Sequence, residues 1–143
     1  MAKKTRKSKT ASLIHERNYY NMGCKIIFGI DEAGRGPWAG PVSAGAVALP
    51  IARNDLTKVL SGVRDSKDMT PLQRANLVDT IKETALAWGV GHATAREIDD
   101  MGIISATKTA MQRALATAME TSKLTPDCLF LDYMLWPERR EIP

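Results

Sequence analysis

The chain has 143 residues, of which 44% are hydrophobic and 25% charged, and its formal net charge is +4. This composition excludes a disordered or fibrous protein, and no apolar run approaches the ~20 residues that a membrane-spanning helix needs. One soluble domain is therefore expected. Because the basic start is not followed by an apolar stretch, no secretory signal is expected, and the predicted location is the cytoplasm.

Positive charge gathers at the N-terminus. The first ten residues carry +5, which leaves −1 for the rest of the chain; the five residues are Lys3, Lys4, Arg6, Lys7 and Lys9. Residues 1–12 are predicted to form a basic disordered tail before a domain at 13–143. Such a tail either solubilises the protein or helps to attract nucleic acid in a salt-dependent way.

The two cysteines, Cys24 and Cys128, are isolated in the sequence. They match no metal-binding spacing, and two are too few for a disulfide framework. We interpret them as packing residues in a reducing cytoplasm.

Residues 13–23 predict a short helix that ends at Gly23. Residues 26–30 then predict a strand that ends in two adjacent acids, Asp31 and Glu32. Neighbouring residues on a strand point to opposite faces, so at least one acid must face solvent or a ligand. Because burying an unpaired carboxylate is costly, a bound cation is a natural partner for this pair.

A glycine-rich turn follows the acids and holds Gly34, Arg35 and Gly36. The glycines let the backbone approach a bulky group closely, and the arginine carries a charge suited to phosphate. Acids for a metal beside such a loop indicate a phosphodiester site. An ordinary surface turn with acids and glycines is the alternative, and the spacing alone does not separate the two.

The string GIDEAGRGPWAGPV at residues 29–42 resembles the first motif of the ribonuclease HII family. The resemblance implies an α/β protein with the ribonuclease H-like fold, in which a mixed sheet of three antiparallel strands, extended by parallel ones, is flanked by helices. It also implies that Asp31 and Glu32 bind a divalent metal. In the family, the glycine-arginine-glycine turn, here Gly34, Arg35 and Gly36, engages the junction between deoxyribose and ribose.

Residues 42–49 predict a second strand, antiparallel to the first because the connection is short. A polar loop with one helical turn near residues 56–60 follows. It contains Asp65, Ser66 and Lys67, a triplet that also resembles the family, where it stands near the active site. Ser66 and Lys67 are therefore candidate substrate-binding residues, and a simple capping turn is the alternative.

A capping box that begins at Thr70 starts a helix with an apolar face made of Leu72, Ala75, Val78 and Ile81. Residues 86–93 predict a third strand with Trp88 and Val90 on one face. We interpret His92, at the end of this strand, as structural. A second capping box begins at Thr94, and Gly102 is expected to break its helix. The next helix, residues 103–121, has a stripe of Ala and Met that predicts core packing.

The apolar run 128–131 is typical of an internal strand covered on both faces, and it ends in Asp132. A second strand thus delivers a carboxylate at its C-terminal end. If the two strands are neighbours, Asp31, Glu32 and Asp132 come together. The order of elements, β-β-α-β-α-β, predicts a mixed sheet flanked by helices.

The resemblance makes Asp31, Glu32 and Asp132 the expected catalytic and metal-binding residues. Hard oxygen ligands suit Mg²⁺ or Mn²⁺, and two such ions could activate water and neutralise the departing oxygen. The implied activity is endonucleolytic cleavage of the RNA strand of RNA–DNA hybrids, and of duplex DNA at embedded ribonucleotides, leaving a 3′-hydroxyl. The expected partner is such a hybrid or duplex; no membrane partner is expected, and the protein is expected to be a monomer.

The chain departs from the family pattern at two points. Tyr133 stands where a small residue usually follows the third acid. The family also has a fourth carboxylate, a helix rich in serine and alanine, and a sugar-stacking tyrosine, all of which would follow Pro143. The C-terminal part is therefore expected to be missing. Two alternatives to the nuclease remain: a truncated relative that binds hybrid without cleaving it, and a small basic nucleic-acid-binding protein.

Overall fold

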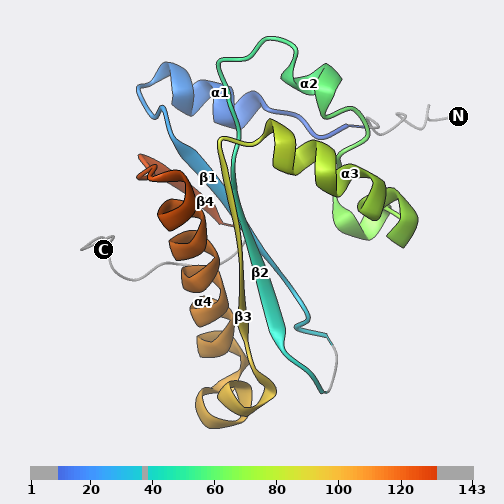
Figure 1. The fold of residues 1–143 in the computed structure, drawn as a ribbon, viewed down its shortest axis with the longest axis vertical. Helices are drawn as coiled ribbons and strands as arrows, with labels where there is room; N and C mark the ends of the chain where they lie inside the picture. The colour runs from blue at the N-terminus through green and yellow to red at the C-terminus, as the bar shows by residue number, and fades with distance from the viewer. Residues whose placement is uncertain (1–9, 37–38, 132–143) are drawn as a thin grey trace, which may run out of the picture.

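The computed structural model describes residues 10–36 and 39–131 (Figure 1). Its helices are α1 (Ile14–Asn21), α2 (Leu56–Val59), α3 (Pro71–Thr84) and α4 (Ala95–Ser122), with a short 3₁₀ helix, η1 (Ser66–Asp68). Its strands are β1 (Ile27–Ala33), β2 (Val42–Ala48), β3 (Ala87–Ala93) and β4 (Cys128–Leu131). The predicted order of strands and helices is confirmed. In the described ranges, no helix is both long and apolar enough to cross a bilayer.

The four strands form one mixed sheet in the order β3-β2-β1-β4. β1 pairs with β2, and β2 with β3, in antiparallel fashion, whereas β4 lies parallel to β1. This confirms the predicted sheet of three antiparallel strands extended by a parallel one. The prediction of an internal β4 is wrong for the described part of the chain, because there β4 pairs with β1 alone and all its residues are only half-buried.

The core lies between the sheet and α4, which runs along one side of it (Figure 1). The predicted Ala and Met stripe of α4 is buried as expected, at Ala106, Ala110, Met111, Ala114 and Ala118. Small residues also line the facing positions of β2 and β3, including Ala44, Ala46, Gly89 and Gly91, so the helix can approach the strands closely. Gly102 breaks the helix as predicted, with φ of 80°.

The opposite face of the sheet is more exposed, and we call it the open face. Trp88 and Val90 lie on it together, as predicted, and are 40% and 47% exposed. The expected apolar face of α3 is not buried: Leu72 is 70% exposed, and no residue of this helix is buried. Only Ile81 of that face joins a small cluster, which it forms with Leu56 and its neighbours. The capping box determined where α3 starts but not whether its apolar face is covered.

The interpretation of the cysteines as separate packing residues is wrong. The fold brings Cys24, just before β1, next to Cys128, at the start of β4, and the structure joins them in a disulfide. Their separation of 104 residues along the chain concealed this pairing. It follows from the parallel alignment of β1 with β4, which sequence spacing does not show.

Residues 1–9 of the predicted basic tail lie outside the described residues, and that part of the tail stays a prediction. The next residues already contact the domain: the Ala11 N–H donates to the Val63 carbonyl oxygen at 2.7 Å. The Thr10 hydroxyl accepts a hydrogen bond from the Gly62 N–H at 3.0 Å.

Candidate active site

The two acids of β1 point to opposite faces of the sheet. Residues of β1 alternate in burial, so that Phe28 and Ile30 face α4 while Gly29 and Asp31 face the open side. Asp31 is accordingly exposed, and Glu32, on the side of α4, is half-buried. The sequence-based expectation that the acids could not share one face is therefore confirmed.

A shallow depression of about 610 Å³ lies beside Asp31 on the open face. It exists because the strand neighbours of Asp31 lack side chains: Gly45 lies opposite on β2, and Gly29 precedes on β1. Phe130 of β4 forms another part of its lining. The Asp31 carboxylate contacts the backbone through Oδ1, which accepts from the Glu32 N–H at 2.8 Å. The two glycines therefore leave space for a further group beside this carboxylate.

The turn after β1 depends on Gly34. Its φ is +94°, and a Cβ there would lie 2.8 Å from the carbonyl oxygen of Pro41. Both the backbone angle and the close approach require glycine. The turn places Arg35 three residues after Glu32.

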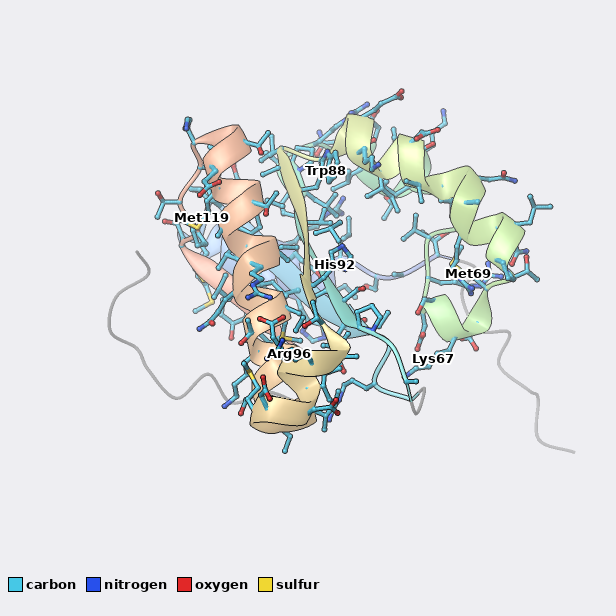
Figure 2. The ribbon with its side chains drawn as sticks, turned by 60° about the horizontal axis from the view of Figure 1, so that its bottom comes forward. Lys67, Met69, Trp88, His92, Arg96 and Met119 are labelled. Atoms are coloured by element: carbon cyan, nitrogen blue, oxygen red, sulfur yellow. A yellow bond between two sulfur atoms is a disulfide. The ribbon has the colours of Figure 1, made fainter. Side chains whose placement is uncertain are left out.

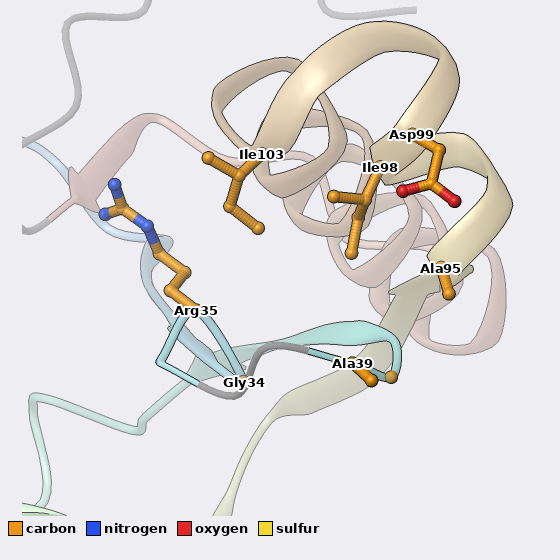
Figure 3. A pocket seen from close by; sticks show the side chains of 8 residues that line it. Gly34, Arg35, Ala39, Ala95, Ile98, Asp99 and Ile103 are labelled. Carbon is orange, nitrogen blue, oxygen red and sulfur yellow. The ribbon is translucent and has the colours of Figure 1, made fainter.

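Arg35 links the turn to Glu32. Its Nη1 donates to Glu32 Oε1 at 3.1 Å, and the two side chains are 38% and 17% exposed, respectively. Arg35 also lines a cleft of about 190 Å³ between the turn and the start of α4. Figure 3 shows Ile98, Asp99 and Ile103 of α4 across this cleft from Arg35. No sequence pattern indicated this second wall, because only the tertiary fold places α4 against the turn.

A clamp between Glu97 and Arg113 fixes the first turn of α4, which borders the cleft. The Arg113 guanidinium donates to Glu97 Oε1 at 2.7 Å and Oε2 at 3.0 Å, and to the His92 carbonyl oxygen at 2.7 Å. Glu97 also closes the predicted capping box with Thr94. The hydrogen bonds from Arg113, with those from Thr94, lower the pKa of Glu97 to about 2. One arginine thus joins the end of β3 to the helix on both sides of the break at Gly102.

Replacing Glu97 with glutamine should make the protein less stable at neutral pH but not at strongly acidic pH. The pKa of Glu97 is about 2 in the folded protein, below its ordinary 4.5, so its charge stabilises the fold above pH 4.5. That contribution declines as the pH falls from 4.5 toward 2. Thermal unfolding should show a gap in Tm between wild type and Glu97→Gln that narrows over this range. Glu120→Gln, on the same helix, is the control, and a gap independent of pH would contradict the prediction.

The third predicted acid, Asp132, lies outside the described residues. The last described pair of the two parallel strands is Ile30 with Leu131. These residues immediately precede Asp31 and Asp132 in the sequence. The two strands are therefore neighbours, which is the condition under which the acids would come together. That the three acids meet stays a prediction.

The Ser66 and Lys67 pair lies in η1, ahead of α3, and Figure 2 shows Lys67 on the α3 side of the molecule, away from α4. Locally the triplet is the capping turn that the sequence allowed, because Asp65 Oδ1 accepts from the Lys67 N–H at 2.9 Å. No hydrogen bond or ion pair among the described residues joins Lys67 to Asp31, Glu32 or Arg35. A role in substrate binding therefore stays a prediction.

His92 has a partner that the sequence did not reveal. It lies opposite Ser43 on β2, and its Nδ1 is 2.8 Å from the Ser43 hydroxyl. The contact joins neighbouring strands on the open face. It agrees with the interpretation of His92 as a structural residue.

The donor chemistry of Asp31 and Glu32 fits a hard divalent cation, because both offer carboxylate oxygens at one strand end. Within residues 10–36 and 39–131, no three or more His, Cys, Asp or Glu side chains converge into a metal site. The described chain thus supplies two carboxylates on opposite faces of one strand, with open space beside Asp31 and Arg35 paired with Glu32.

Comparison with known proteins supplies the family. The ribonuclease HII family profile matches residues 28–132. The chain is 44% identical over 119 residues to a ribonuclease HII of Acetivibrio thermocellus, covering 83% of this chain and 43% of that protein. It is 46% identical over 125 residues to a ribonuclease HII of Roseiflexus castenholzii, covering 87% of this chain and 56% of that protein. The chain therefore spans about half the length of these curated relatives.

Solved structures share the fold. A crystal structure of Bst-RNase HIII in complex with Mn²⁺ superposes with a TM-score of 0.61 at 20% identity, covering 81% of this chain and 39% of that one. A ribonuclease H2 from Pyrococcus horikoshii superposes with a TM-score of 0.56 at 30% identity, covering 75% of this chain and 49% of that one. The predicted ribonuclease H-like fold is confirmed.

Proposed function

Because the chain belongs to the ribonuclease HII family, we propose that the protein is an endonuclease that hydrolyses the RNA strand of RNA–DNA hybrids. The observation that carries this proposal is the parallel pairing of β1 with β4. Asp31 and Glu32 stand at the end of β1, and the last described pair joins Ile30 to Leu131, one residue before Asp132. Two neighbouring strands, one with Asp31 and Glu32 near its end and the other followed in the sequence by Asp132, support an acidic site here.

We propose Asp31, Glu32 and Asp132 as the residues that hold Mg²⁺ or Mn²⁺ and carry catalysis. When bound, a pair of such ions would activate the attacking water and neutralise the charge on the departing oxygen. The Mn²⁺ bound by Bst-RNase HIII, which shares this fold, supports the choice of a divalent ion. The carboxylates supply charge and position, so the reaction requires no nucleophilic side chain.

We propose that the loop of Gly34, Arg35 and Gly36 binds the nucleic-acid strand, with Ser66 and Lys67 contacting it from the side of α3. Arg35 lies beside Glu32 at 3.1 Å and lines the cleft toward α4, so its guanidinium can reach a strand held near the acids. RNA and DNA have the same phosphate groups, so discrimination between the two strands must rest on the 2′-hydroxyl of RNA. Cleavage at single ribonucleotides in duplex DNA, leaving a 3′-hydroxyl, is part of the proposal.

We further propose that the protein acts in the cytoplasm, and as a monomer.

A cleavage assay tests this function. The protein expressed from its complete reading frame is incubated with an end-labelled DNA duplex that carries one ribonucleotide, and with an all-DNA duplex as the control. We expect a nick at the ribonucleotide that requires Mg²⁺ or Mn²⁺ and leaves a 3′-hydroxyl, with the all-DNA duplex intact. Binding without cleavage at either metal would favour the non-cleaving relative instead. If binding disappears when residues 1–10 are deleted, the result would favour the alternative of a small basic nucleic-acid-binding protein.

A further inference from the structure

Asp127, the residue before β4, reaches back to the chain that enters β1. Its Oδ2 accepts hydrogen bonds from the N–H groups of Lys25 and Ile26, each at 2.8 Å. Its own N–H donates to the Ile26 carbonyl oxygen at 2.8 Å. One side chain and its backbone therefore hold both residues that immediately precede β1.

This contact sits at one end of the ladder between β1 and β4. Within residues 10–36 and 39–131, β1 and β4 share four residue pairs, from Ile27 with Cys128 to Ile30 with Leu131. Parallel pairing is slightly less stable per residue than antiparallel pairing. A slip by one residue would turn every β4 side chain to the opposite face of the sheet. A fixed contact at one end of the ladder prevents β4 from slipping relative to β1 along the whole ladder.

The contact lies at the starts of the two strands, whereas Asp31 and Glu32 lie near the end of β1 and Asp132 follows β4 in the sequence. Asp31 follows Ile27 by four residues, just as Asp132 follows Cys128 by four residues. The register that Asp127 fixes therefore decides which β4 residues come level with the end of β1. On the premise of the proposed function, we propose that Asp127 is a positioning residue: by holding the chain before β1, it sets the register of β4 and so brings the metal-binding carboxylates together.

The disulfide between Cys24 and Cys128 joins the same junction. It restricts the unfolded chain as well as the folded one, and a dithiol reductant opens it to two thiols by supplying two electrons and two protons. Asp127 makes its contact through hydrogen bonds alone, so it acts whether the cysteines are paired or reduced. The Asp127 variants are therefore compared with and without dithiothreitol.

The test uses the protein from its complete reading frame with three substitutions: Asp127→Ala, Asp127→Asn and the control Asp55→Ala. Asp55 is also exposed but pairs locally with Arg53, away from both strands. Three measurements are made: Mn²⁺ affinity by calorimetry, hydrogen exchange of the β4 amides in the metal-free protein, and kcat and KM for the ribonucleotide-containing duplex.

Asp127→Ala should weaken Mn²⁺ binding and lower kcat by about 10-fold or more, the size of effect seen when a residue that orients a metal ligand is removed. Its β4 amides should exchange faster, and KM should change less than about 3-fold, because the glycine-arginine-glycine loop is untouched. Asp127→Asn keeps an accepting oxygen and should recover most of the loss. Asp55→Ala should behave as wild type.

Wild-type Mn²⁺ affinity and β4 exchange in Asp127→Ala would overturn the proposal. A variant with a lower Tm would also overturn the proposal if its Mn²⁺ affinity and kcat, measured at temperatures well below that Tm, equalled those of wild type. Asp127 would then only stabilise the fold. If Asp127→Ala does not fold, Asp127→Glu, which displaces the carboxylate, takes its place under the same criteria. If wild type itself neither binds Mn²⁺ nor cleaves, the proposed function fails, and β4 exchange still reports whether Asp127 sets the register.

Discussion

Replacing Asp31 with asparagine should lower kcat for the proposed metal-dependent cleavage by more than about 100-fold, since even residues that only orient metal ligands account for about 10–100-fold. The substitution removes the negative charge and one of the oxygens that a hard cation requires. It should leave the fold intact, because Asp31 is exposed and an amide oxygen can still accept the bond from the Glu32 N–H. The measurement is kcat on a duplex with one ribonucleotide, together with Tm.

Asp79→Asn is the matched control for this experiment. It makes the same chemical change at an exposed position on α3 and should leave both kcat and Tm unchanged. If Asp31→Asn has the same kcat as wild type, Asp31 does not have the proposed catalytic role. A large fall in Tm would instead show that the loss of activity came from the fold.

Replacing Gly91 with alanine should destabilise the protein by about 3 kcal/mol, at the upper end of the usual cost of overpacking. Gly91 faces α4, and a Cβ there would overlap the backbone of Ala110 and Ala114. A flexible side chain could move aside, but the backbone of a helix must shift as a whole. For a domain of this size we expect a fall in Tm of about 10 °C, measured by thermal unfolding.

Gly29→Ala provides the comparison. Gly29 also lies within a strand of the sheet, but a Cβ there would meet nothing within 4 Å. Because alanine has less freedom than glycine in the unfolded chain, a small gain of about 0.4–1 kcal/mol is expected. Equal losses of stability at the two positions would contradict close packing between β3 and α4.

Several local features followed directly from the sequence. The starts of α3 and α4 were predicted correctly because a capping box is completed by residues three apart, whatever the rest of the chain does. The break at Gly102 and the buried stripe of α4 were likewise predicted from local patterns, namely a glycine and the helical period. The alternation of β1 placed Asp31 and Glu32 on opposite faces without any knowledge of the sheet.

Covered faces and distant contacts were decided only by the tertiary structure. An apolar face on α3 does not state whether anything packs against it, and Leu72 remains exposed. The disulfide of Cys24 with Cys128, like the hydrogen bonds of Asp127, joins residues about a hundred positions apart, which no spacing rule connects.

The candidate site divides in the same way. By itself the sequence determined where the candidate acids and the arginine stand, since a strand with Asp31 and Glu32 near its end and a turn holding Arg35 are local patterns. Only the tertiary structure decided what those residues face: Gly45 opposite Asp31, α4 across the cleft from Arg35, and β4 beside β1. The physical reason is that hydrogen bonds within a helix turn or cap join near neighbours, whereas sheet register and helix packing depend on how the whole chain buries its apolar surface.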